Sequence, residues 1–505
     1  MAIAPSLLSG AAFIRSETLI RNQSQLSDLN RQLSTGERAT TYGDLGSSRV
    51  QSISLREDIS RLEAYQSSIT RVDIRVEITT LSLERLEALR IEARDAIDPN
   101  NFIDLGNGNT FTQQSARLLL TETVALLNSQ ADDRYVFGGN DVTTPPVENL
   151  DIILNGDGVR DGLRAVTDER LRADIGANGL GRLDLSINPA TPAVVDLAEQ
   201  AATVFGFDVG SVASGLSNVN TTLTPGEPAS LAVDFTAQPN PGETFSIFLD
   251  LPDGTSRTVE LTARAAGNSA GAFAIGNTPE ATAENFRAAL QDQLSLVART
   301  DLNAASRITS ARNFFDTQAG RLPQRVDTPG TPETAIGLVD ADPATTVLYY
   351  TGQNDSANPR EGLSARVDDT ITVNYGLRAN EEALRGGITV LAAFAIADFT
   401  SGTDQQNQEA HAAFATRAGN DLAVQVDAPS VQSVIQEIAG IQSITGNADR
   451  RHTIALNALN GVRENVERAD PTEVAVQLLQ LQTRIEASFQ ASARISQLSL
   501  LNFLN

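Results

Sequence analysis

Two heptad patterns, one near each end of the 505-residue chain, constrain its fold more than any other feature. Apolar side chains recur every seven positions in both regions, with a second set filling the matching position of each heptad. Such a narrow apolar seam is typical of helices that pair as a coiled coil. We expect one long helix from each terminal region, paired antiparallel. The predicted intramolecular helical seam consists of Leu62, Ile69, Val72, Val76, Leu83, Leu86, Val434, Ile438, Ile441, Leu459, Val462 and Val466.

The outermost segments predict a second pair of amphipathic helices. Asp470-Pro471 begins a new helix in the last region, because proline in a first turn loses no needed hydrogen bond. A lone molecule has nothing to cover the apolar side chains of these outer helices, so we expect neighbouring copies to cover them. The residues alone leave open an ordinary helical domain with an inserted β domain. The predicted assembly interface consists of Leu26, Leu29, Leu33, Leu478, Leu481, Ile485, Phe489, Ile495, Leu498 and Leu501.

The middle of the chain holds most of the glycine and proline and predicts β structure. A hairpin is expected around the turn pair Asp253-Gly254, followed by an amphipathic helix. The fold class is therefore α+β: a long antiparallel coiled-coil bundle from both terminal regions, with one or two inserted β-rich mixed domains. The expected elements of the middle are a hairpin at 244–262, a helix at 277–294, and strands at 345–352 and 368–377.

These patterns predict five segments along the chain. They are an N-terminal assembly helix (1–45), the N-terminal part of a helical core domain (46–148), the inserted β-rich region (149–380), the C-terminal part of the core domain (381–469) and a C-terminal assembly helix (470–505).

The charge is acidic and unevenly placed. The net charge is −25, all 38 basic residues are arginine, and most of the acidic excess lies in 136–449. Nearly neutral ends can approach copies of themselves with little repulsion. No basic cluster is dense enough to predict nucleic-acid binding, and no apolar run reaches the ~18 residues of a membrane span. The first residues lack the charged and apolar regions of a Sec signal, so export would need another route.

Missing residue types argue against catalysis. The chain has no cysteine or lysine and only two histidines, so thiol nucleophiles, Schiff bases and thiolate zinc sites are excluded. We expect no enzymatic activity, no cofactor and no metal. One G-x-S-x-G match, 267–271 with Ser269, admits a serine hydrolase with His411 or His452. No clear strand precedes it and no clear helix follows, so a flexible loop is the favoured interpretation. His452 falls on a heptad position and is expected to be a packed interface side chain.

Several stretches resemble the bacterial flagellin superfamily. Residues 29–44 (LNRQLSTGERATTYGD), 62–95 and 457–504 resemble its N-terminal helix and loop, its long helix and its closing helix pair. Residues 134–147 (RYVFGGNDVTTPPV) and the ending LSLLNFL resemble the hook–filament junction subfamily most. The segment after Arg38 matches the family more weakly and the outer region is long, which keeps filament flagellin as the alternative.

The resemblance implies a function and a location. It implies a structural adapter that joins the flagellar hook to the filament by self-assembly through its terminal helices. It implies extracellular placement in the flagellum, after unfolded export by the flagellar type III route without a cleaved signal peptide. The implied partners are copies of itself in a ring or helical assembly, another hook-associated protein on the hook side, flagellin on the filament side and an export chaperone. A surface adhesin or serine hydrolase carried on the middle region is the remote alternative.

Overall fold

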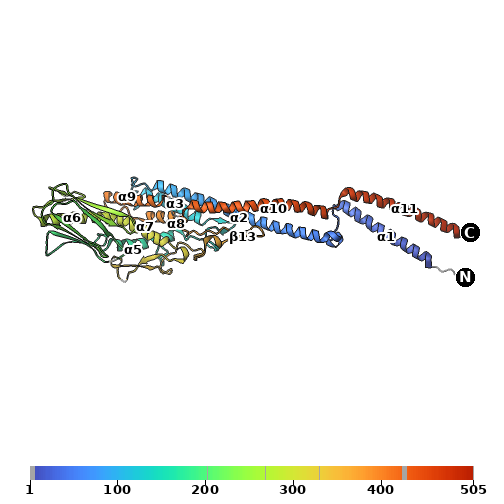
Figure 1. Cartoon of the computed structure of the whole chain (residues 1–505), viewed down its shortest axis with the longest axis horizontal. Helices are drawn as coiled ribbons and strands as arrows, with labels where there is room; N and C mark the ends of the chain where they lie inside the picture. Colours follow the sequence, from blue (N-terminus) through green and yellow to red (C-terminus); the bar gives the residue numbers. More distant parts are fainter. Residues whose placement is uncertain (1–5, 202, 268, 329, 424–428, 504–505) are drawn as a thin grey trace. The chain divides into compact units, whose positions relative to one another are not determined.

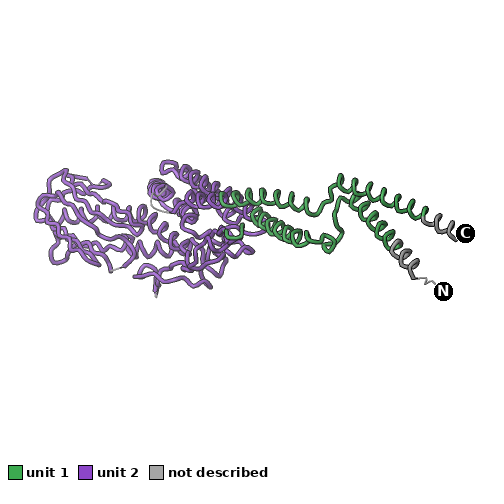
Figure 2. The backbone as a smooth tube through the Cα atoms, turned by 45° about the vertical axis from the view of Figure 1, so that its right-hand side comes forward, with its two compact units in different colours: residues 1–71, 366–372, 443–505 green, residues 72–365, 373–442 purple. Residues whose placement is uncertain are grey.

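The computed structural model describes residues 6–201, 203–267, 269–328, 330–423 and 429–503, with side chains described within 16–494 (Figure 1). The chain divides into two compact units, coloured in Figure 2. Unit 1 contains residues 1–71, 366–372 and 443–505, and unit 2 contains residues 72–365 and 373–442. The division falls within two long helices, α2 (Arg49–Ala96) and α10 (Val431–Glu467).

Unit 1 is built from paired helices. Helix α1 (Ser6–Thr35) packs against α11 (Pro471–Phe503), and the start of α1 lies at the same end of this pair as the end of α11, so the helices are antiparallel (Figure 1). The first part of α2 pairs with the last part of α10 in the same sense. Gln66 of α2, for example, donates to Asp449 and Thr453 of α10 at 3.1 and 3.0 Å.

The two links between the helix pairs are bonded to each other. Gly36 ends α1 with a φ of 71°, a left-handed conformation that glycine adopts without strain. The Arg38 amide donates to the Glu467 carbonyl at 2.8 Å, and the Ala469 amide donates to the Gly36 carbonyl at 3.0 Å. The chain therefore leaves α1 and enters α11 at one ordered joint, which also contains the short helix η1 (Tyr42–Ser48).

The helical part of unit 2 surrounds α8, whose second half is mostly apolar and buried. Ten of the residues of this helix are buried, from Leu384 and Ile388 through Ile396. Because every residue from 388 to 396 is buried, this half of the helix is covered on every side, and α3, α7 and α9 pack against the helix. The helices of this part are α3 (Phe111–Leu127), α4 (Leu150–Asn155), α5 (Leu163–Ile175), α7 (Asn303–Phe315), α8 (Glu382–Ile396) and α9 (Asp404–Asp421).

Two four-stranded sheets and helix α6 (Pro279–Val297) share one apolar core in unit 2. The first sheet has the order β10-β9-β8-β5, antiparallel except for the parallel β10–β9 pair, and the second is antiparallel with the order β3-β4-β7-β6. The strands are β3 (Leu183–Ile187), β4 (Val194–Glu199), β5 (Asp208–Ser214), β6 (Val219–Thr224), β7 (Ser230–Phe235), β8 (Thr244–Asp250), β9 (Ser256–Arg264) and β10 (Ala272–Ala274).

Short elements complete the described chain. The π-helical turn η2 (Ala298–Leu302) joins α6 to α7, and 3-10 turns occur at Gln318–Gly320, Pro332–Thr334 and Pro359–Gly362. The small strands are β1 (Gln130–Ala131), β2 (Arg134–Tyr135), β11 (Gln324–Val326), β12 (Leu338–Asp340), β13 (Ser364–Arg366) and β14 (Thr372–Asn374). No helix among the described residues is long and apolar enough to cross a membrane.

The predicted α+β class, with helical terminal regions and inserted sheets, is confirmed. The predicted hairpin is the β8–β9 pair, and the predicted helix is α6, with Thr278 as N-cap and Pro279 in its first turn. The predicted strand at 345–352 is wrong: only isolated bridges form there, at Thr346 and Tyr350. The strand predicted at 368–377 is reduced to β14, because the preceding residues form a tight turn.

Candidate assembly surface

The seam residues on α2 lie on its buried side. Ile69, Val72, Val76 and Leu83 are almost fully buried, Leu86 is buried and Leu62 is half-buried. On α10, Val434, Ile438 and Val466 are buried, and Ile441 and Leu459 are half-buried.

One residue of the predicted seam on α10, Val462, is exposed. Val462 is 41% exposed, whereas Leu456, which the heptad pattern passed over, is buried. An α-helix has 3.6 residues per turn, so a strict seven-residue repeat drifts by about 20° per heptad. The drift accumulates along this long helix and turns Val462 away from α2.

The α1–α11 pair covers only part of its apolar surface. Leu481 is buried, and Leu26, Leu29, Leu478 and Ile485 are half-buried. Leu29 and Leu481 line a groove of about 260 Å³ whose other lining side chains are polar, among them Gln25, Gln32, Gln477 and Gln480. The centre of the pair is therefore only partly apolar.

The remaining residues of the predicted interface are exposed or not described. Leu33 and Phe489 are each about half-exposed. Ile495, Leu498 and Leu501 lie outside the residues whose side chains the structure describes.

Three exposed apolar side chains on the same two helices were not predicted. Ile20 of α1 is 66% exposed, Leu479 of α11 is 62% exposed, and Val476 is half-exposed. They lie between the heptad positions, on the sides of the helices away from the α1–α11 contact. A search for single seams overlooks them, and only a test for a second apolar face would have found them.

The carboxylate of Glu467 holds the joint between the helix pairs. Glu467 accepts from Ser52 at 2.6 Å and binds the Arg56 guanidinium through both oxygens, at 2.8 and 2.7 Å. The hydrogen bond from Arg56 lowers the pKa of Glu467, and this effect outweighs burial, which acts to raise the pKa. A groove of about 510 Å³, lined mainly by the 35–45 segment and by Arg56, Arg463 and Arg468, lies at this joint.

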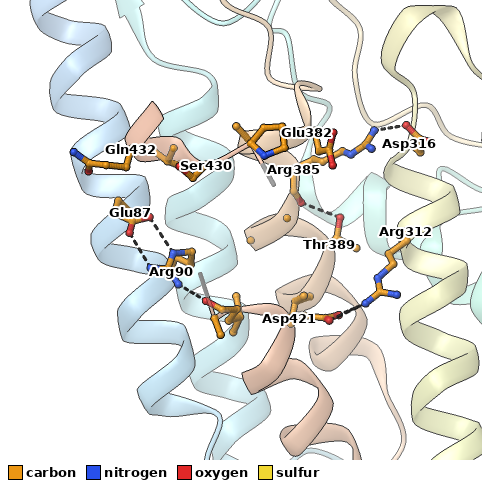
Figure 3. A pocket seen from close by; sticks show the side chains of 18 of the residues that line it. Glu87, Arg90, Arg312, Asp316, Glu382, Arg385, Thr389, Asp421, Ser430 and Gln432 are labelled. Atoms are coloured by element: carbon orange, nitrogen blue, oxygen red, sulfur yellow. Dashed lines mark hydrogen bonds and ion pairs between the residues drawn. The ribbon is translucent and has the colours of Figure 1, made fainter. Parts of the chain in front are cut away.

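A pocket of about 570 Å³ lies in unit 2 between α2, α7, α8 and the end of α9 (Figure 3). Three of its four acidic lining side chains are engaged: Asp421 binds Arg312 at 2.7 Å, Asp316 binds Arg385, and Glu87 binds Arg90 at 2.8 Å. Carboxylates that are tied to guanidinium groups are poor general bases. The lining is that of a structural ion-pair cluster.

The residues of the hydrolase alternative do not form a nucleophile elbow. Ser269 is exposed in the loop between β9 and β10, and its carbonyl accepts from the Ala272 amide in a turn, while Asn268 lies outside the described residues. His411 is fully buried against Phe102, Phe394 and Phe399, and its Nε2 lies 2.8 Å from the Thr112 hydroxyl.

No metal site is apparent in the described ranges. They contain no group of three or more histidine, cysteine or acidic side chains placed to hold a metal ion. The acidic loop at 155–162 is a turn in which Asp157 accepts from the Val159 and Arg160 amides and from the Arg160 side chain. The backbone hydrogen bond from Arg160 is the main cause that lowers the pKa of Asp157 to about 2.

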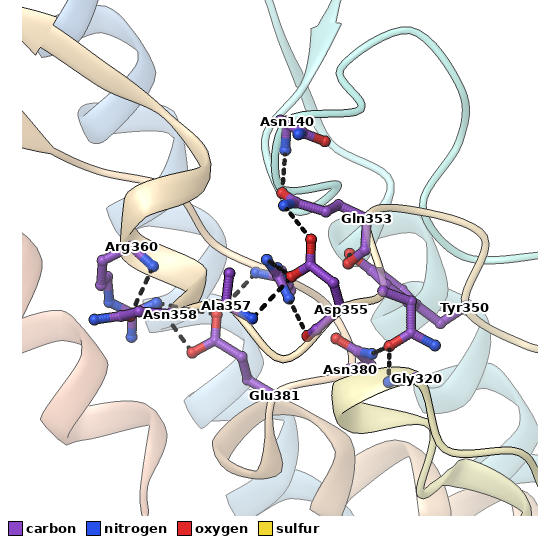
Figure 4. A network of polar contacts seen from close by, with 12 residues as sticks. Asn140, Gly320, Tyr350, Gln353, Asp355, Ala357, Asn358, Arg360, Asn380 and Glu381 are labelled. Carbon is purple, nitrogen blue, oxygen red and sulfur yellow. Dashed lines mark hydrogen bonds and ion pairs between the residues drawn. The ribbon is translucent and has the colours of Figure 1, made fainter.

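The aromatic-Gly-Gly segment (137–139) is fixed by a polar network (Figure 4). Gly139 has a φ of 67°, and a Cβ there would lie 2.6 Å from Oε1 of Gln353. Gln353 in turn accepts from the Asn140 amide and donates to Asp355, which binds the buried Arg378 at 2.7 Å. Only glycine fits this close approach, which gives the second glycine of the pattern a physical cause.

Comparison with known proteins finds a family model that matches the two-helix N-terminal region. Residues 9–97 match the family model of the bacterial flagellin N-terminal helical region, a span that covers most of α1, the joint and α2. No curated protein matched the chain. The family match supports the bacterial flagellin superfamily for this chain and, with it, a flagellar structural subunit.

Proposed function

We propose that this chain is a structural subunit that joins the flagellar hook to the filament by assembling through α1 and α11. One observation carries the proposal. The α1–α11 pair has a partly polar groove inside and leaves Ile20, Val476 and Leu479 exposed outside. Large apolar side chains exposed on both helices of the pair are a surface that a neighbouring copy in a tube would bury.

The junction role rests on the 134–147 segment. Asn140 of this segment lies in the Figure 4 network, where its amide donates to Gln353. Further along the segment, the Thr351 amide donates to the Pro146 carbonyl at 2.9 Å. A tightly bonded exit from the helical region supports a fixed adapter. The proposed partners are other copies, a second hook-associated protein, flagellin and an export chaperone, with type III export to the cell exterior. We propose no enzymatic activity. Filament flagellin is the second candidate, favoured by the size of the inserted β part.

Gene deletion separates the two candidates. Loss of a junction protein leaves hooks intact and releases flagellin into the medium, whereas loss of filament flagellin leaves hooks and junctions without released subunits. Electron microscopy of antibody-labelled flagella gives the second readout. A single band at the hook boundary supports the junction role, and label along the whole filament supports flagellin.

The apolar face is tested by substitution. Val476→Ser combined with Leu479→Ser is expected to abolish attachment of filaments in a deletion strain while the purified chain keeps its helix content. Val159→Ser is the matched control, because Val159 is more exposed than either residue and lies in a loop of unit 2. Normal motility of the double variant would remove the support that this face gives to the proposal.

A further inference from the structure

Residues 366–372, the turn between β13 and β14, belong to unit 1 and lie beside its long helices (Figure 2). We propose that this segment, the strap, locks the axial register of α10 against α2 through a junction of Tyr65, His452 and the strap itself. The inference concerns the long-helix pair and does not depend on the proposed flagellar role.

The apolar seam alone specifies this register poorly. Heptad positions repeat along α10, so a slide of seven residues, about 10 Å, places apolar positions opposite apolar positions again. In this part of unit 1 the buried side of the pair also contains small or polar side chains, among them Ser52, Thr445 and Ala448. Such side chains bury little apolar area, so they discriminate weakly between the native and shifted registers.

The junction ties one ring from each helix to the strap. The Tyr65 ring of α2 stacks on the His452 ring of α10, with centroids 5.6 Å apart and planes at 26°. Nε2 of His452 lies 2.8 Å from the Val367 carbonyl, and because a carbonyl only accepts, Nε2 carries the hydrogen. The Tyr65 hydroxyl donates to Asp369 at 2.9 Å. A slide of α10 would separate the rings and break the bond from His452 to the strap.

Ion pairs anchor the strap to both helices at the same level. Arg451, next to His452, binds Asp368 at 2.7 Å, and Arg61, one turn before Tyr65, lies 3.6 Å from Asp369. The guanidinium of Arg366 lies over the Tyr65 ring, 5.9 Å from its centroid.

The strap is itself a closed turn. The Val367 amide donates to the Ile371 carbonyl at 3.0 Å, and the Val367 side chain is fully buried. Since neighbouring strap residues bind α2 and α10, the strap can dock with all its contacts only when the helices are in the native register. Docking and register are therefore coupled.

The absence of cysteine makes the register measurable. Gln66→Cys with Thr453→Cys reports the native register, because Gln66 donates to Thr453 at 3.0 Å. Gln66→Cys with Asn460→Cys reports a shift of one heptad. Each pair is placed in the otherwise full-length chain, and the yields of a short bismaleimide cross-link are compared.

The lock is then removed in three ways: His452→Leu, which keeps an apolar seam, Tyr65→Phe, which removes the hydroxyl donor, and Asp369→Ala, which removes the carboxylate acceptor. We expect the ratio of native to shifted cross-link yield to fall about fivefold or more with His452→Leu, because this variant loses both a buried hydrogen bond and a ring stack that stabilise the native register. The other two variants keep the ring stack and the hydrogen bond of His452, so their ratios should fall less. Arg450→Ala is the control, because Arg450 is exposed and bonds Asn447 one turn away on its own helix. An unchanged ratio in all three variants overturns the proposal. If His452→Leu loses helix content by circular dichroism, the ratios of the Tyr65 and Asp369 variants decide.

Discussion

Arg417 of α9 binds Asp301 of the π-helical turn η2 at 2.9 Å, and its Nε binds Asp253 at the β8–β9 turn at 3.1 Å. One guanidinium thus ties the hairpin end of a sheet to the helices of unit 2. All three side chains are largely buried, so a carboxylate left without its partner would remain in a poorly solvated place.

Replacing Arg417 is expected to loosen this attachment. Arg417→Gln leaves Asp253 without its guanidinium partner, while Asp301 keeps Arg257 at 3.4 Å, so we expect the free energy of unfolding of unit 2 to fall by about 2 kcal/mol. Thermal unfolding followed by circular dichroism measures the loss. Arg172→Gln is the matched control: Arg172 pairs with Glu333 but its side chain is more than half exposed, so its loss should cost less than about 1 kcal/mol. Equal losses in the two variants would show that the bridge does not fasten the sheet.

Phe286 of α6 connects the two sheets of unit 2. Its ring meets Phe235 of β7, Phe245 of β8 and Phe273 of β10 at centroid distances of 5.0 to 5.4 Å, and it is fully buried. Phe286→Ala should lower the free energy of unfolding by about 3–5 kcal/mol, because it leaves a cavity against three rings. Phe248→Ala, at a partly exposed site on β8, is the control and should cost far less in the same urea titration. A small effect at Phe286 would mean that the two sheets do not share one core.

The helical ends and the β8–β9 hairpin could be predicted because their sequence signals are local. Apolar spacing, Pro471 after Asp470 and the Asp253-Gly254 turn pair each act over a few residues. The 345–352 run shows where local signals fail. Its valine and tyrosines are buried as in a strand, but its backbone bonds to loop residues, with the Glu148 amide donating to the Tyr349 carbonyl at 2.9 Å.

The candidate surface was harder to predict than the fold. Ile20, Val476 and Leu479 lie outside the heptad positions, so periodicity did not select them. The strap could not be predicted either, because Tyr65 and Asp369 are about 300 residues apart in the chain and nothing local to either residue indicates the contact. His452 was expected to pack in the seam, but its bond to a carbonyl of the strap depends on the tertiary fold.

Gly139 is expected to tolerate no side chain. Gly139→Ala forces a left-handed backbone on alanine and brings its Cβ against Gln353, so we expect a loss of about 1–3 kcal/mol in the free energy of unfolding. Gly158→Ala is the control, since Gly158 also has a positive φ but its Cβ would meet nothing within 4 Å. The difference between the two variants isolates the close approach to Gln353, and no difference would contradict the role assigned to that contact.

His411 should make unit 2 sensitive to acid. Burial lowers the pKa of His411 to about 4, whereas the unfolded chain binds its proton near the ordinary value of 6.5. The folded state therefore holds the neutral ring, and its advantage is complete above pH 6.5. This advantage is lost as the pH falls from 6.5 to 4, which lowers the free energy of unfolding by up to about 3 kcal/mol. Urea titrations that follow the unfolding of unit 2, repeated at intervals across this pH range, measure how steeply the free energy of unfolding depends on pH. His411→Leu should remove that slope even if it lowers stability at pH 7. His452→Leu, at the only other histidine, should keep it, and a slope that survives His411→Leu would assign the acid sensitivity to other groups.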